Sequence, residues 1–488
     1  MRPLIHEVQT RCTPESLAAQ LDSDAGVVLL RTSLFSGPHA RYSLIAVRPF
    51  LSLRSFGSRC EIQSDGKRVV QFGNPWRVLE SLMARYELLD EIDLPFPLGG
   101  CFGFWGYDLK NFVEPKLARQ AVNDLELPDC AVGFYDSLVV FDHLLDKTWI
   151  VSTGLHPDGS RDSTRARRQL AEWQSLLQDS PPLESSRITH HASRFPMPVT
   201  STLSRASFRA AVETAQRYIR AGDIYQVNLS HRLAAPWLAS GWDMYQRLRT
   251  ASPAPFSAYL NCGDFQIASS SPELFLRLSG AHILTRPIKG TRPRSSDPGR
   301  DAQLGNELRS SAKDQAELVM ITDLLRNDLG RVCEYGSVQV PDLVCLERYP
   351  HVQHLVSTVD GHLRSDVTHL AALASCFPGG SITGAPKFRA MEIIDELEPV
   401  TRGPYTGAMG YLGFNRESEF SILIRTATCC GGRAYFPVGA GIVADSVPEA
   451  EYEETLAKAG GFFDALNLQT QLEFNSRIEM PLPSPLRL

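Results

Sequence analysis

Residues 286–294 read Arg-Pro-Ile-Lys-Gly-Thr-Arg-Pro-Arg and follow the apolar residues Ala281, Ile283 and Leu284. This order predicts a strand that runs into a Gly-Pro turn at the rim of a sheet. Lys289 would lie there among arginines, whose charges favour a neutral and nucleophilic amine. The alternative is a solvated lysine on a basic turn, which is the commoner case for nine such residues taken alone.

Lysine is rare in this chain. Only 8 of the 49 basic residues are lysines, and the other 41 are arginines. A lysine can lose its proton and attack a carbon atom, whereas an arginine keeps its charge. The composition therefore favours a chemical role for Lys289 without deciding it.

The overall composition indicates a globular enzyme. Of the 488 residues, 43% are hydrophobic and 21% are charged, which is ordinary for globular proteins. The net charge of −6 argues against a nucleic-acid partner, which usually requires a basic stripe. Ten scattered cysteines without a Cys-x-x-Cys pair predict free thiols in a reducing compartment. The chain has no signal-peptide core and no apolar run that could span a membrane, so we expect a cytoplasmic enzyme without a membrane partner.

Four regions are predicted along the chain: a β-rich unit over 1–175, a Pro- and Ser-rich linker over 176–204, alternating strands and helices over 205–466, and a peripheral tail over 467–488. Ser204 and Gly222 are typical caps for a helix between them. In the first region a helix is expected over Trp76–Tyr86, and strands are expected at four branched or aromatic runs: Val27–Leu30, Tyr42–Val47, Val69–Phe72 and Ser137–Phe141.

Cys101 has neighbours that suggest a catalytic nucleophile. Gly99-x-Cys101-x-Gly103 has the form of the nucleophile elbow of a glutamine amidotransferase. Such a cysteine needs a histidine base with an acidic partner, usually as His-x-Glu. None of the twelve histidines has a glutamate two residues later. We therefore interpret Cys101 as a packed residue and expect the chain to lack a glutaminase of its own.

Two predicted helices carry carboxylates at a spacing of three residues. Asp314 and Glu317 share one helix face, with roughly 5–6 Å between Cβ atoms, and Glu451 and Glu454 share another. Such carboxylates could hold a hard cation such as Mg²⁺, which prefers oxygen ligands. The alternative is two solvated helix faces, which is the commoner case for either pair alone.

Glycine-rich segments lie close to these helices in sequence. Residues 438–446 read as a glycine-rich strand directly before the second helix, and residues 377–387 read as a glycine loop that opens another. Both could bring backbone N–H groups close to an anion. Arg425 is a charge within an apolar strand predicted over 420–425. A buried arginine needs an anion, and either a substrate carboxylate or an internal ion pair could supply it.

Seven motifs resemble those of a known family, the chorismate-utilising enzymes. The N-terminal half resembles the family more loosely. The resemblance implies an α+β fold, with a large antiparallel β-sandwich core built from both halves of the chain and helices around it. The motifs follow the family's order over residues 205–462: Asp223-Ile-Tyr-Gln-Val-Asn-Leu229, Ser271-Pro-Glu273, Pro287-Ile-Lys-Gly-Thr291, Asp323-Leu-Leu-Arg-Asn-Asp328, His354-Leu-Val-Ser, Gly384-Ala-Pro-Lys387 and Gly439-Ala-Gly-Ile-Val-Ala-Asp-Ser446 with Glu454.

Two positions distinguish branches of the family. Isochorismate and salicylate synthases have a lysine base where this chain has Gln226, and a glutamine cannot take a proton from water. Members that form anthranilate typically read Pro-Ile-Ala-Gly-Thr where this chain has Lys289. The resemblance therefore implies amination of chorismate to 4-amino-4-deoxychorismate, on the route to p-aminobenzoate and folate. An anthranilate-forming enzyme is the closest alternative, and a non-catalytic regulatory subunit is a more distant one.

The resemblance also implies a mechanism. Glu317, Glu451 and Glu454, with Asp314 nearby, would hold the Mg²⁺ that anchors the ring carboxylate. Lys289 would attack C2 of chorismate as the covalent nucleophile. Glu273 would then act as general acid for the departing C4 hydroxyl. Ammonia would add at C4 and displace Lys289.

The remaining implied roles concern the substrate and a partner. A separate glutamine amidotransferase subunit would supply ammonia, and an ammonium salt would replace it in vitro. The positions that match the family's chorismate contacts are Gln226, His354, Ser381, Thr383, Gly384, Tyr411, Arg425, Gly439, Gly441 and Lys458.

Two positions depart from the family pattern. Ser381 stands where a threonine is expected, which keeps a hydroxyl but alters the packing. Arg31 stands where feedback-regulated members have an acidic residue that meets an amino-acid ammonium group. We therefore do not expect inhibition by tryptophan, although a tryptophan bound for structural reasons remains compatible with the sequence.

Overall fold

Two sheets of twelve strands each form the centre of the molecule. The structure, a computed structural model, describes residues 2–32, 41–88, 94–179, 199–349 and 352–467. The strand pairs within both sheets are antiparallel throughout this part of the chain.

The first sheet has its strands in the order β1 (Leu4–Val8), β10 (Lys147–Ser152), β9 (Ser137–Asp142), β3 (Tyr42–Ala46), β2 (Val28–Arg31), β13 (Phe256–Asn261), β14 (Phe265–Ser271), β23 (Thr426–Cys430), β24 (Arg433–Ile442), β12 (Gln226–Pro236) and β11 (Thr200–Ser201), with β20 (Gly384–Ala385) paired to β12. The second has the order β17 (Ile288–Pro293), β19 (Val352–His362), β16 (His282–Arg286), β15 (Leu274–Ser279), β22 (Glu417–Ile422), β21 (Ala408–Gly413), β7 (Gly100–Trp105), β8 (Cys130–Tyr135), β4 (Leu51–Phe56), β5 (Arg59–Ser64) and β6 (Lys67–Phe72), with β18 (Gln339–Arg348) paired to β19.

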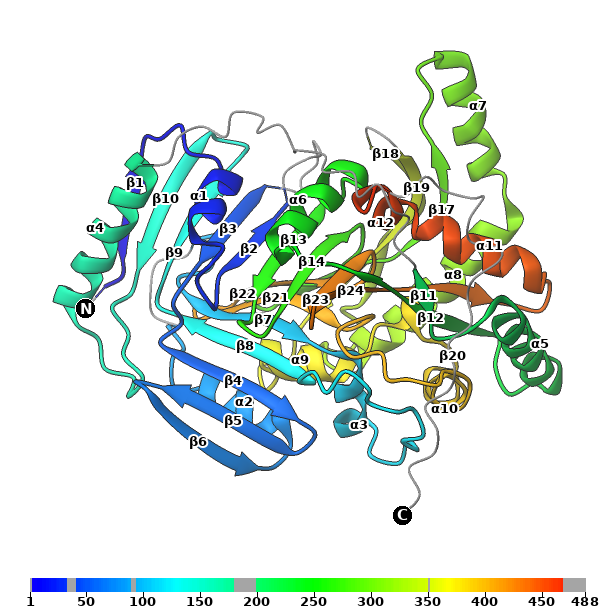
Figure 1. Ribbon diagram of the computed structural model, residues 1–488, viewed down its shortest axis with the longest axis horizontal. Coiled ribbons are helices and arrows are strands. Elements are labelled where there is room, and N and C mark those ends of the chain that lie inside the picture. Colours follow the sequence, from blue (N-terminus) through cyan, green and yellow to red (C-terminus); the bar gives the residue numbers. More distant parts are fainter. Residues whose placement is uncertain (1, 33–40, 89–93, 180–198, 350–351, 468–488) are drawn as a thin grey trace.

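Helices surround the two sheets (Figure 1). In that view α7, α8 and α11 lie at one end of the molecule, near β17, and α1 and α4 lie at the opposite end. The helices are α1 (Pro14–Leu21), α2 (Pro75–Met83), α3 (Lys110–Val113), α4 (Ser163–Asp179), α5 (Arg205–Ala221), α6 (Gly241–Ala251), α7 (Pro298–Arg309), α8 (Ala312–Gly330), α9 (His369–Cys376), α10 (Lys387–Leu397), α11 (Pro448–Lys458) and α12 (Gly460–Ala465), with the 3-10 turns η1 (Tyr107–Leu109) and η2 (Gly380–Ile382).

The two sheets share one apolar core. Val28 and Ala258 of the first sheet and Phe102 and Leu276 of the second belong to the same buried cluster. β2 pairs with β13 and β7 pairs with β21, so the predicted N-terminal and catalytic regions contribute to both sheets. The predicted α+β fold with an antiparallel β-sandwich core is therefore confirmed. The region boundaries stay predictions, because 180–198 and 468–488 lie outside the described residues.

Local sequence signals account for the helices that carry the site. α5 begins after Ser204, whose side chain accepts a hydrogen bond from the Ser207 N–H, and ends at Gly222 with a φ of 84°. α8 begins after Ser311, which caps the Asp314 N–H in the same way. These caps confirm the predicted helix positions, because they satisfy N–H groups that have no partner within the helix. The four predicted N-terminal strands are present as β2, β3, β6 and β9.

Two predictions of local structure are wrong. Residues 288–293 form strand β17, at the edge of the second sheet, instead of a Gly-Pro turn. The register against β19 shifts between Lys289 and Thr291, and Gly290 between them has a φ of 67°, so the glycine makes a bulge within the strand. Arg425 lies outside any strand, in the link between β22 and β23, with a φ of 51°.

Two predicted site residues, the general acid Glu273 and the carboxylate ligand Arg425, lie where the chain passes from one sheet to the other. Pro272 and Glu273 connect β14 of the first sheet to β15 of the second. Arg425 lies in the reverse connection, from β22 back to β23. Both side chains are therefore held by links that join the two sheets.

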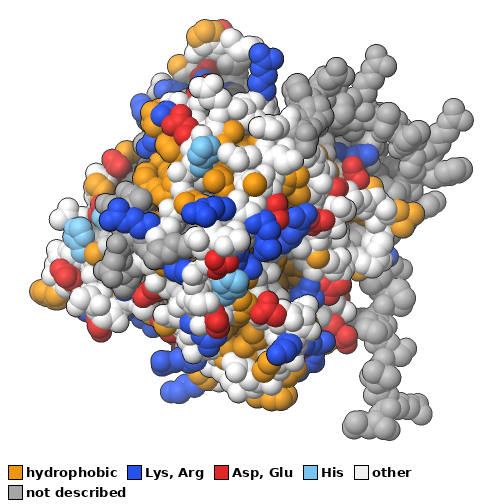
Figure 2. Space-filling view, turned by 90° about the vertical axis from the view of Figure 1, so that its left-hand side faces the viewer, with side chains coloured by type: hydrophobic (Ala, Val, Ile, Leu, Met, Phe, Trp, Pro, Cys, Tyr) orange, Lys and Arg blue, Asp and Glu red, His pale blue; other side chains and the backbone are white. Residues whose placement is uncertain are grey.

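The surface carries charges of both signs. On the face that Figure 2 shows, acidic and basic side chains of the described residues are interspersed among apolar ones. The described helices include none with the length and apolar character needed to cross a bilayer. All ten cysteines are free, and Cys101 lies buried in β7, where burial raises the pKa of its thiol.

Candidate active site

A cavity of about 780 Å³ lies between β17 and β19 of the second sheet, β24 of the first, and helices α8 and α11. It brings together residues as far apart in the sequence as Asn228 and Gly461. The predicted site residues that line it are Glu273, Lys289, Asp314, Glu317, His354, Ser381, Arg425, Gly439, Gly441, Glu454 and Lys458.

Lys289 projects from β17 into the cavity, and carboxylates rather than arginines surround its amine. Its Nζ lies 3.8 Å from Glu317 Oε2. The expectation that arginine charges act on Lys289 is therefore wrong, because each neighbouring arginine has a carboxylate partner. Arg286 pairs with Glu347, Arg292 with Asp314 and Arg294 with Asp301.

Gly441 lets the opposite sheet come close to this lysine. A Cβ atom on Gly441 would lie 3.6 Å from Lys289 Nζ and 2.4 Å from Gln226 Nε2. Any side chain at this position of β24 would therefore displace Gln226, and its Cβ would touch the amine at ordinary van der Waals distance.

Glu273 is a buried acid in the same cavity. Burial raises the pKa of its carboxyl to about 7, although a hydrogen bond from Ser381 and the charge of Lys289 act in the opposite direction. At neutral pH a substantial fraction of Glu273 therefore holds a proton, as a general acid must. Ser381 thus retains the hydroxyl of the expected threonine, and this hydroxyl donates a hydrogen bond to Glu273.

His354 is held in its neutral form. Its Nδ1 lies 3.3 Å from the Gly290 carbonyl oxygen and 2.9 Å from Thr291 Oγ1. Burial and the nearby charge of Arg425 lower its pKa to about 4. A neutral imidazole can position a ring or its substituent without adding charge.

Arg425 offers a guanidinium group to the cavity. It is half-buried, burial lowers its pKa, and no carboxylate among the described residues lies within ion-pair distance of it. The sequence left open either a substrate carboxylate or an internal ion pair as the partner of Arg425. The described part of the chain does not supply the internal partner. A φ of 51° is unusual for a residue other than glycine and often occurs at functional sites.

The acidic residues of α8 and α11 face one another across the cavity. Asp314, Glu317 and Glu454 line it, and each has a basic partner, with Glu454 Oε1 2.7 Å from Lys458 Nζ. Glu451 lies behind them and accepts a 2.6 Å hydrogen bond from the Ser446 hydroxyl. In the described structure no three acidic, histidine or cysteine side chains are close enough to hold a metal ion as they stand. The donor set, made of carboxylate oxygens alone, nevertheless fits Mg²⁺ in its chemistry.

Four predicted substrate ligands lie outside the cavity lining. The Thr383 hydroxyl donates to the Gly379 and Gly380 carbonyl oxygens. Gly384 permits β20 to approach β12, because a Cβ there would lie 2.1 Å from the backbone carbonyl oxygen of Gln226. Gln226 itself lies behind Gly441, and its buried Oε1 has no hydrogen-bond partner among the residues that the structure describes.

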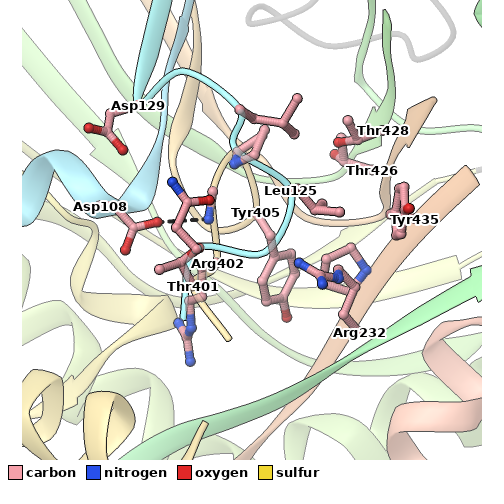
Figure 3. A pocket seen from close by; sticks show the side chains of 15 residues that line it. Asp108, Leu125, Asp129, Arg232, Thr401, Arg402, Tyr405, Thr426, Thr428 and Tyr435 are labelled. Atoms are coloured by element: carbon pink, nitrogen blue, oxygen red, sulfur yellow. Dashed lines mark hydrogen bonds between the residues drawn. The ribbon is translucent and has the colours of Figure 1, made fainter. Parts of the chain in front are cut away.

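Tyr411 is the fourth of these, and its position gives no support to its expected role. Its ring stacks on Phe102 in the core, with 5.4 Å between ring centroids. The cavity takes Tyr405 instead, a residue that the sequence interpretation missed. Tyr405 lies in the segment Gly403-Pro-Tyr-Thr-Gly407, and this glycine-flanked turn was a signal that could have found it. Tyr405 also forms part of the wall of a second cavity of about 20 Å³ (Figure 3).

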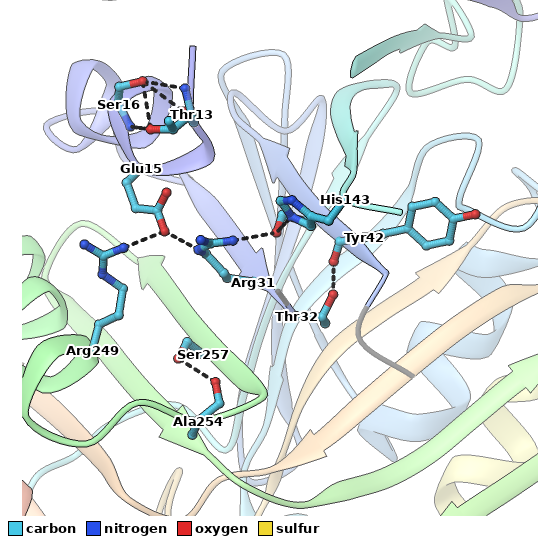
Figure 4. Close-up of polar contacts among 11 residues, drawn as sticks. Thr13, Glu15, Ser16, Arg31, Thr32, Tyr42, His143, Arg249, Ala254 and Ser257 are labelled. Carbon is cyan, nitrogen blue, oxygen red and sulfur yellow. Dashed lines mark hydrogen bonds and ion pairs between the residues drawn. The ribbon is translucent and has the colours of Figure 1, made fainter. Parts of the chain in front are cut away.

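Arg31 does not line this cavity and takes part in an ion-pair network (Figure 4). Glu15 accepts from both Arg31 and Arg249, and the three side chains lie side by side. The arginine that replaces the expected acid is thus occupied by an internal partner. The expected absence of inhibition by tryptophan stays a prediction.

Comparisons with known proteins agree on the family. Residues 34–464 match the family described as chorismate binding enzyme. The chain is 39% identical to anthranilate synthase component 1 of Acetivibrio thermocellus, over 93% of this chain and 92% of that one. It is 40% identical to aminodeoxychorismate synthase component 1 of Escherichia coli K12, over 88% and 91%. It superposes on the crystal structure of anthranilate synthase component I from Streptococcus pneumoniae with a TM-score of 0.75 and 31% identity, over 87% and 92%.

Proposed function

This chain belongs to the chorismate-binding enzymes, and from that premise we propose that it converts chorismate and ammonia to 4-amino-4-deoxychorismate. The observation that carries this proposal is Lys289, whose amine lies in the same cavity as the buried acid Glu273. Identity to relatives does not choose the product, since relatives of both names are equally similar. Lys289 supports the aminated product that retains the pyruvyl group, because a nucleophilic amine is needed only if the enzyme captures the ring covalently.

The proposed reaction uses the two residues in turn. Lys289 Nζ bonds to C2 of chorismate, the two ring double bonds shift, and the C4–O bond breaks. Glu273 gives its proton to the departing hydroxyl, which leaves as water. Ammonia then bonds to C4, the double bonds shift back, and the C2–N bond to Lys289 breaks. A proton from the added nitrogen restores Glu273, so the net change is chorismate plus ammonia to product plus water.

The remaining cavity residues would orient the substrate. Arg425 and Lys458 are the cations placed to meet its carboxylates, and Tyr405 adds a hydroxyl. Lys458 Nζ also donates a 2.9 Å hydrogen bond to the Gly439 carbonyl oxygen, which fixes its direction. Neutral His354 would contact the ring.

Mg²⁺ fits the acidic wall of this cavity. Glu317 and Glu454 would hold the ion with help from Asp314 and Glu451, once the lysines beside them turn away. When bound, the ion would neutralise a substrate carboxylate and so stabilise the bound dianion.

A separate amidotransferase subunit would deliver the ammonia. The relatives are named component 1 of their enzymes, which implies a second component. Cys101 is buried in a strand and its thiol pKa is raised, so it is poorly suited to glutaminase chemistry. Free cysteines throughout agree with a cytoplasmic location.

The test is to incubate the chain with chorismate, Mg²⁺ and an ammonium salt and to identify products by mass and fluorescence. We expect a non-fluorescent product that retains the pyruvyl group, and none from Lys289→Ala. Lys313→Ala is the matched control, because Lys313 lines the same cavity and lies 4.0 Å from Glu317. Fluorescent anthranilate from the wild type would instead assign the chain to the other branch and leave Lys289 without a covalent role.

A further inference from the structure

Arg402 is a buried arginine that uses every N–H group it has. Nε donates to Glu398 Oε2 at 2.8 Å, and Nη2 donates to Glu398 Oε1 at 2.6 Å. The other hydrogens go to the Asn228 carbonyl oxygen at 2.7 Å, the Ile382 carbonyl oxygen at 3.1 Å and Thr406 Oγ1 at 3.2 Å. Its guanidinium also lies 4.7 Å from the centre of the Tyr107 ring. All five N–H donors of the planar guanidinium therefore have acceptors, and lysine could not reproduce this arrangement.

Glu398 is the buried carboxylate partner of Arg402. Its side chain is 5% exposed and that of Arg402 is 2% exposed. Glu398 Oε1 also accepts from the Ser230 N–H at 2.8 Å and from the Ser230 hydroxyl at 2.9 Å. A buried ion pair of this kind is weak evidence for stability, so its position calls for another explanation.

Besides Glu398, Arg402 has three acceptors, and each lies in or next to a different wall of the large cavity. Asn228 lies on β12, Ile382 on η2, and Thr406 follows Tyr405 in the turn before β21. Asn228, Ile382 and Tyr405 all line the cavity, whereas Arg402 does not. Arg402 and Tyr405 lie side by side in the wall of the second cavity (Figure 3), with the guanidinium 5.8 Å from the ring centre.

Local strain supports a positioning role. Thr406 is fully buried and has a φ of 60°, which a β-branched residue adopts only when its surroundings hold it. Its hydroxyl donates to the Tyr405 carbonyl oxygen at 2.6 Å while it accepts from Arg402. The Asn228 side chain hydrogen-bonds to the Tyr405 hydroxyl. Arg402 therefore fixes Tyr405 from both ends.

We propose that Arg402, held by Glu398, is a positioning residue that aligns these three walls and places the Ser381 hydroxyl against the Glu273 carboxyl. Ser381 precedes Ile382 in η2, so the bond from Arg402 to the Ile382 carbonyl fixes the turn that carries Ser381. The role of Glu273 as acid rests on the proposed function, but the placement of Ser381 does not.

This role has a consequence for proton affinity. The hydrogen bond from Ser381 stabilises the charged form of Glu273, and Lys289 of β17 is the charged group that faces the same carboxyl. Removal of the hydrogen bond should raise the pKa of Glu273 by about one unit, since a hydrogen bond to a charged group contributes about that much. Arg402→Lys keeps the positive charge but loses the fork, so it should move the pKa in the same direction.

The experiment titrates Glu273 in the protein without substrate. The protonated-carboxyl infrared band that is absent in Glu273→Gln reports its midpoint in the wild type, Ser381→Ala, Arg402→Lys, Glu398→Gln and the Arg402→Lys/Ser381→Ala double variant. We expect all but the wild type to shift upward, with the double variant no further shifted than Ser381→Ala alone. Arg389→Lys is the matched control on α10, where Arg389 is partly exposed and pairs with Glu392.

Two results would overturn the proposal: an Arg402→Lys midpoint equal to that of the wild type, or shifts that add in the double variant. Thermal unfolding is followed for each variant, and Glu398→Gln carries the test if Arg402→Lys does not fold. Because no substrate is present, absence of product from the wild type would refute the proposed function and leave this result unchanged.

Discussion

Among single residues, Glu273 leads to the most direct prediction about how the reaction rate depends on pH. Its carboxyl must hold a proton when the C4 hydroxyl leaves, and burial raises its pKa to about 7. The protonated fraction falls as the pH rises through that value, so we expect kcat to fall above about pH 7. Glu273→Gln should lower kcat about 10²–10⁴-fold and abolish this limb of the profile.

The measurement of this profile is kcat against pH at a constant concentration of free ammonia, so that the protonation of ammonia does not contribute. Glu392→Gln serves as control, because Glu392 is a partly exposed partner of Arg389. A wild-type rate that stays constant from pH 6 to pH 9 would mean that Glu273 does not act as the acid.

Site residues could be predicted from the sequence where they belong to a short motif. They could not be predicted where only the folded structure determines which side chain reaches the cavity. Lys289 and Glu273 stand in short motifs, and both line the cavity. Tyr411 and Tyr405 are two tyrosines six positions apart near glycines, and only the packing of Tyr411 on Phe102 separates them. Whether a carboxylate reaches the Arg425 guanidinium, as none of the described residues does, depends on every neighbour of that side chain, which a single sequence does not display.

Among the elements, β17 owes its shape to one glycine. Gly290 has a φ of 67°, and a Cβ there would lie 2.7 Å from Leu308 Cδ1 of α7. Gly290→Ala should therefore lower the free energy of unfolding by more than the roughly 1–2 kcal/mol that a left-handed alanine costs. Urea denaturation measures the difference.

The matched control for this prediction is Gly336→Ala. Gly336 has a φ of 79°, and no atom of the described residues lies within 4 Å of a Cβ built on it. It should show the backbone cost alone. Equal losses in the two variants would mean that contact between β17 and α7 contributes nothing.

The faces of α8 and α11 lead to a prediction about metal binding. Glu454→Gln should weaken Mg²⁺ binding at least tenfold, because a neutral amide replaces a carboxylate at the proposed site. Isothermal titration with Mg²⁺ measures it. Glu453→Gln is the control, since Glu453 neighbours it on α11 but pairs with Arg205 outside the cavity. An unchanged affinity in Glu454→Gln would place the ion elsewhere.

Element positions were largely predictable because local signals set them. Ser204 and Gly222 delimit α5 as their capping preferences indicate. The strand β17 was mistaken for a turn because its partner β19 begins about 60 residues later, and Gly and Pro in the segment are turn signals by themselves. Pairing with a distant strand overrides such signals.

At the scale of the whole molecule, the fold was predicted from family resemblance and not from periodicity. Strand runs in the first 175 residues and strand–helix alternation later suggested two units. The structure instead places strands of both regions in both sheets, through β2 with β13 and β7 with β21. Which strand neighbours which is set by long-range packing, and one sequence carries no direct record of it.

The shared sheets predict that neither region folds alone. Residues 1–175 by themselves would expose β2 and β7 as apolar sheet edges. We expect this fragment, and equally 205–466, to lack cooperative thermal unfolding, and the two to regain it when mixed. Circular dichroism during heating measures this. A cooperative transition in either fragment alone would show an independent domain.

The two links between the sheets have a further consequence for how this enzyme can change over evolutionary time. The acid Glu273 and the cation Arg425 stand on opposite crossings, so the span between them records how one sheet is seated on the other. Insertions at the outer hairpins leave that span untouched, whereas one residue gained or lost in either crossing alters it at once. The lengths of these two connections should therefore be the slowest-changing feature of the lineage.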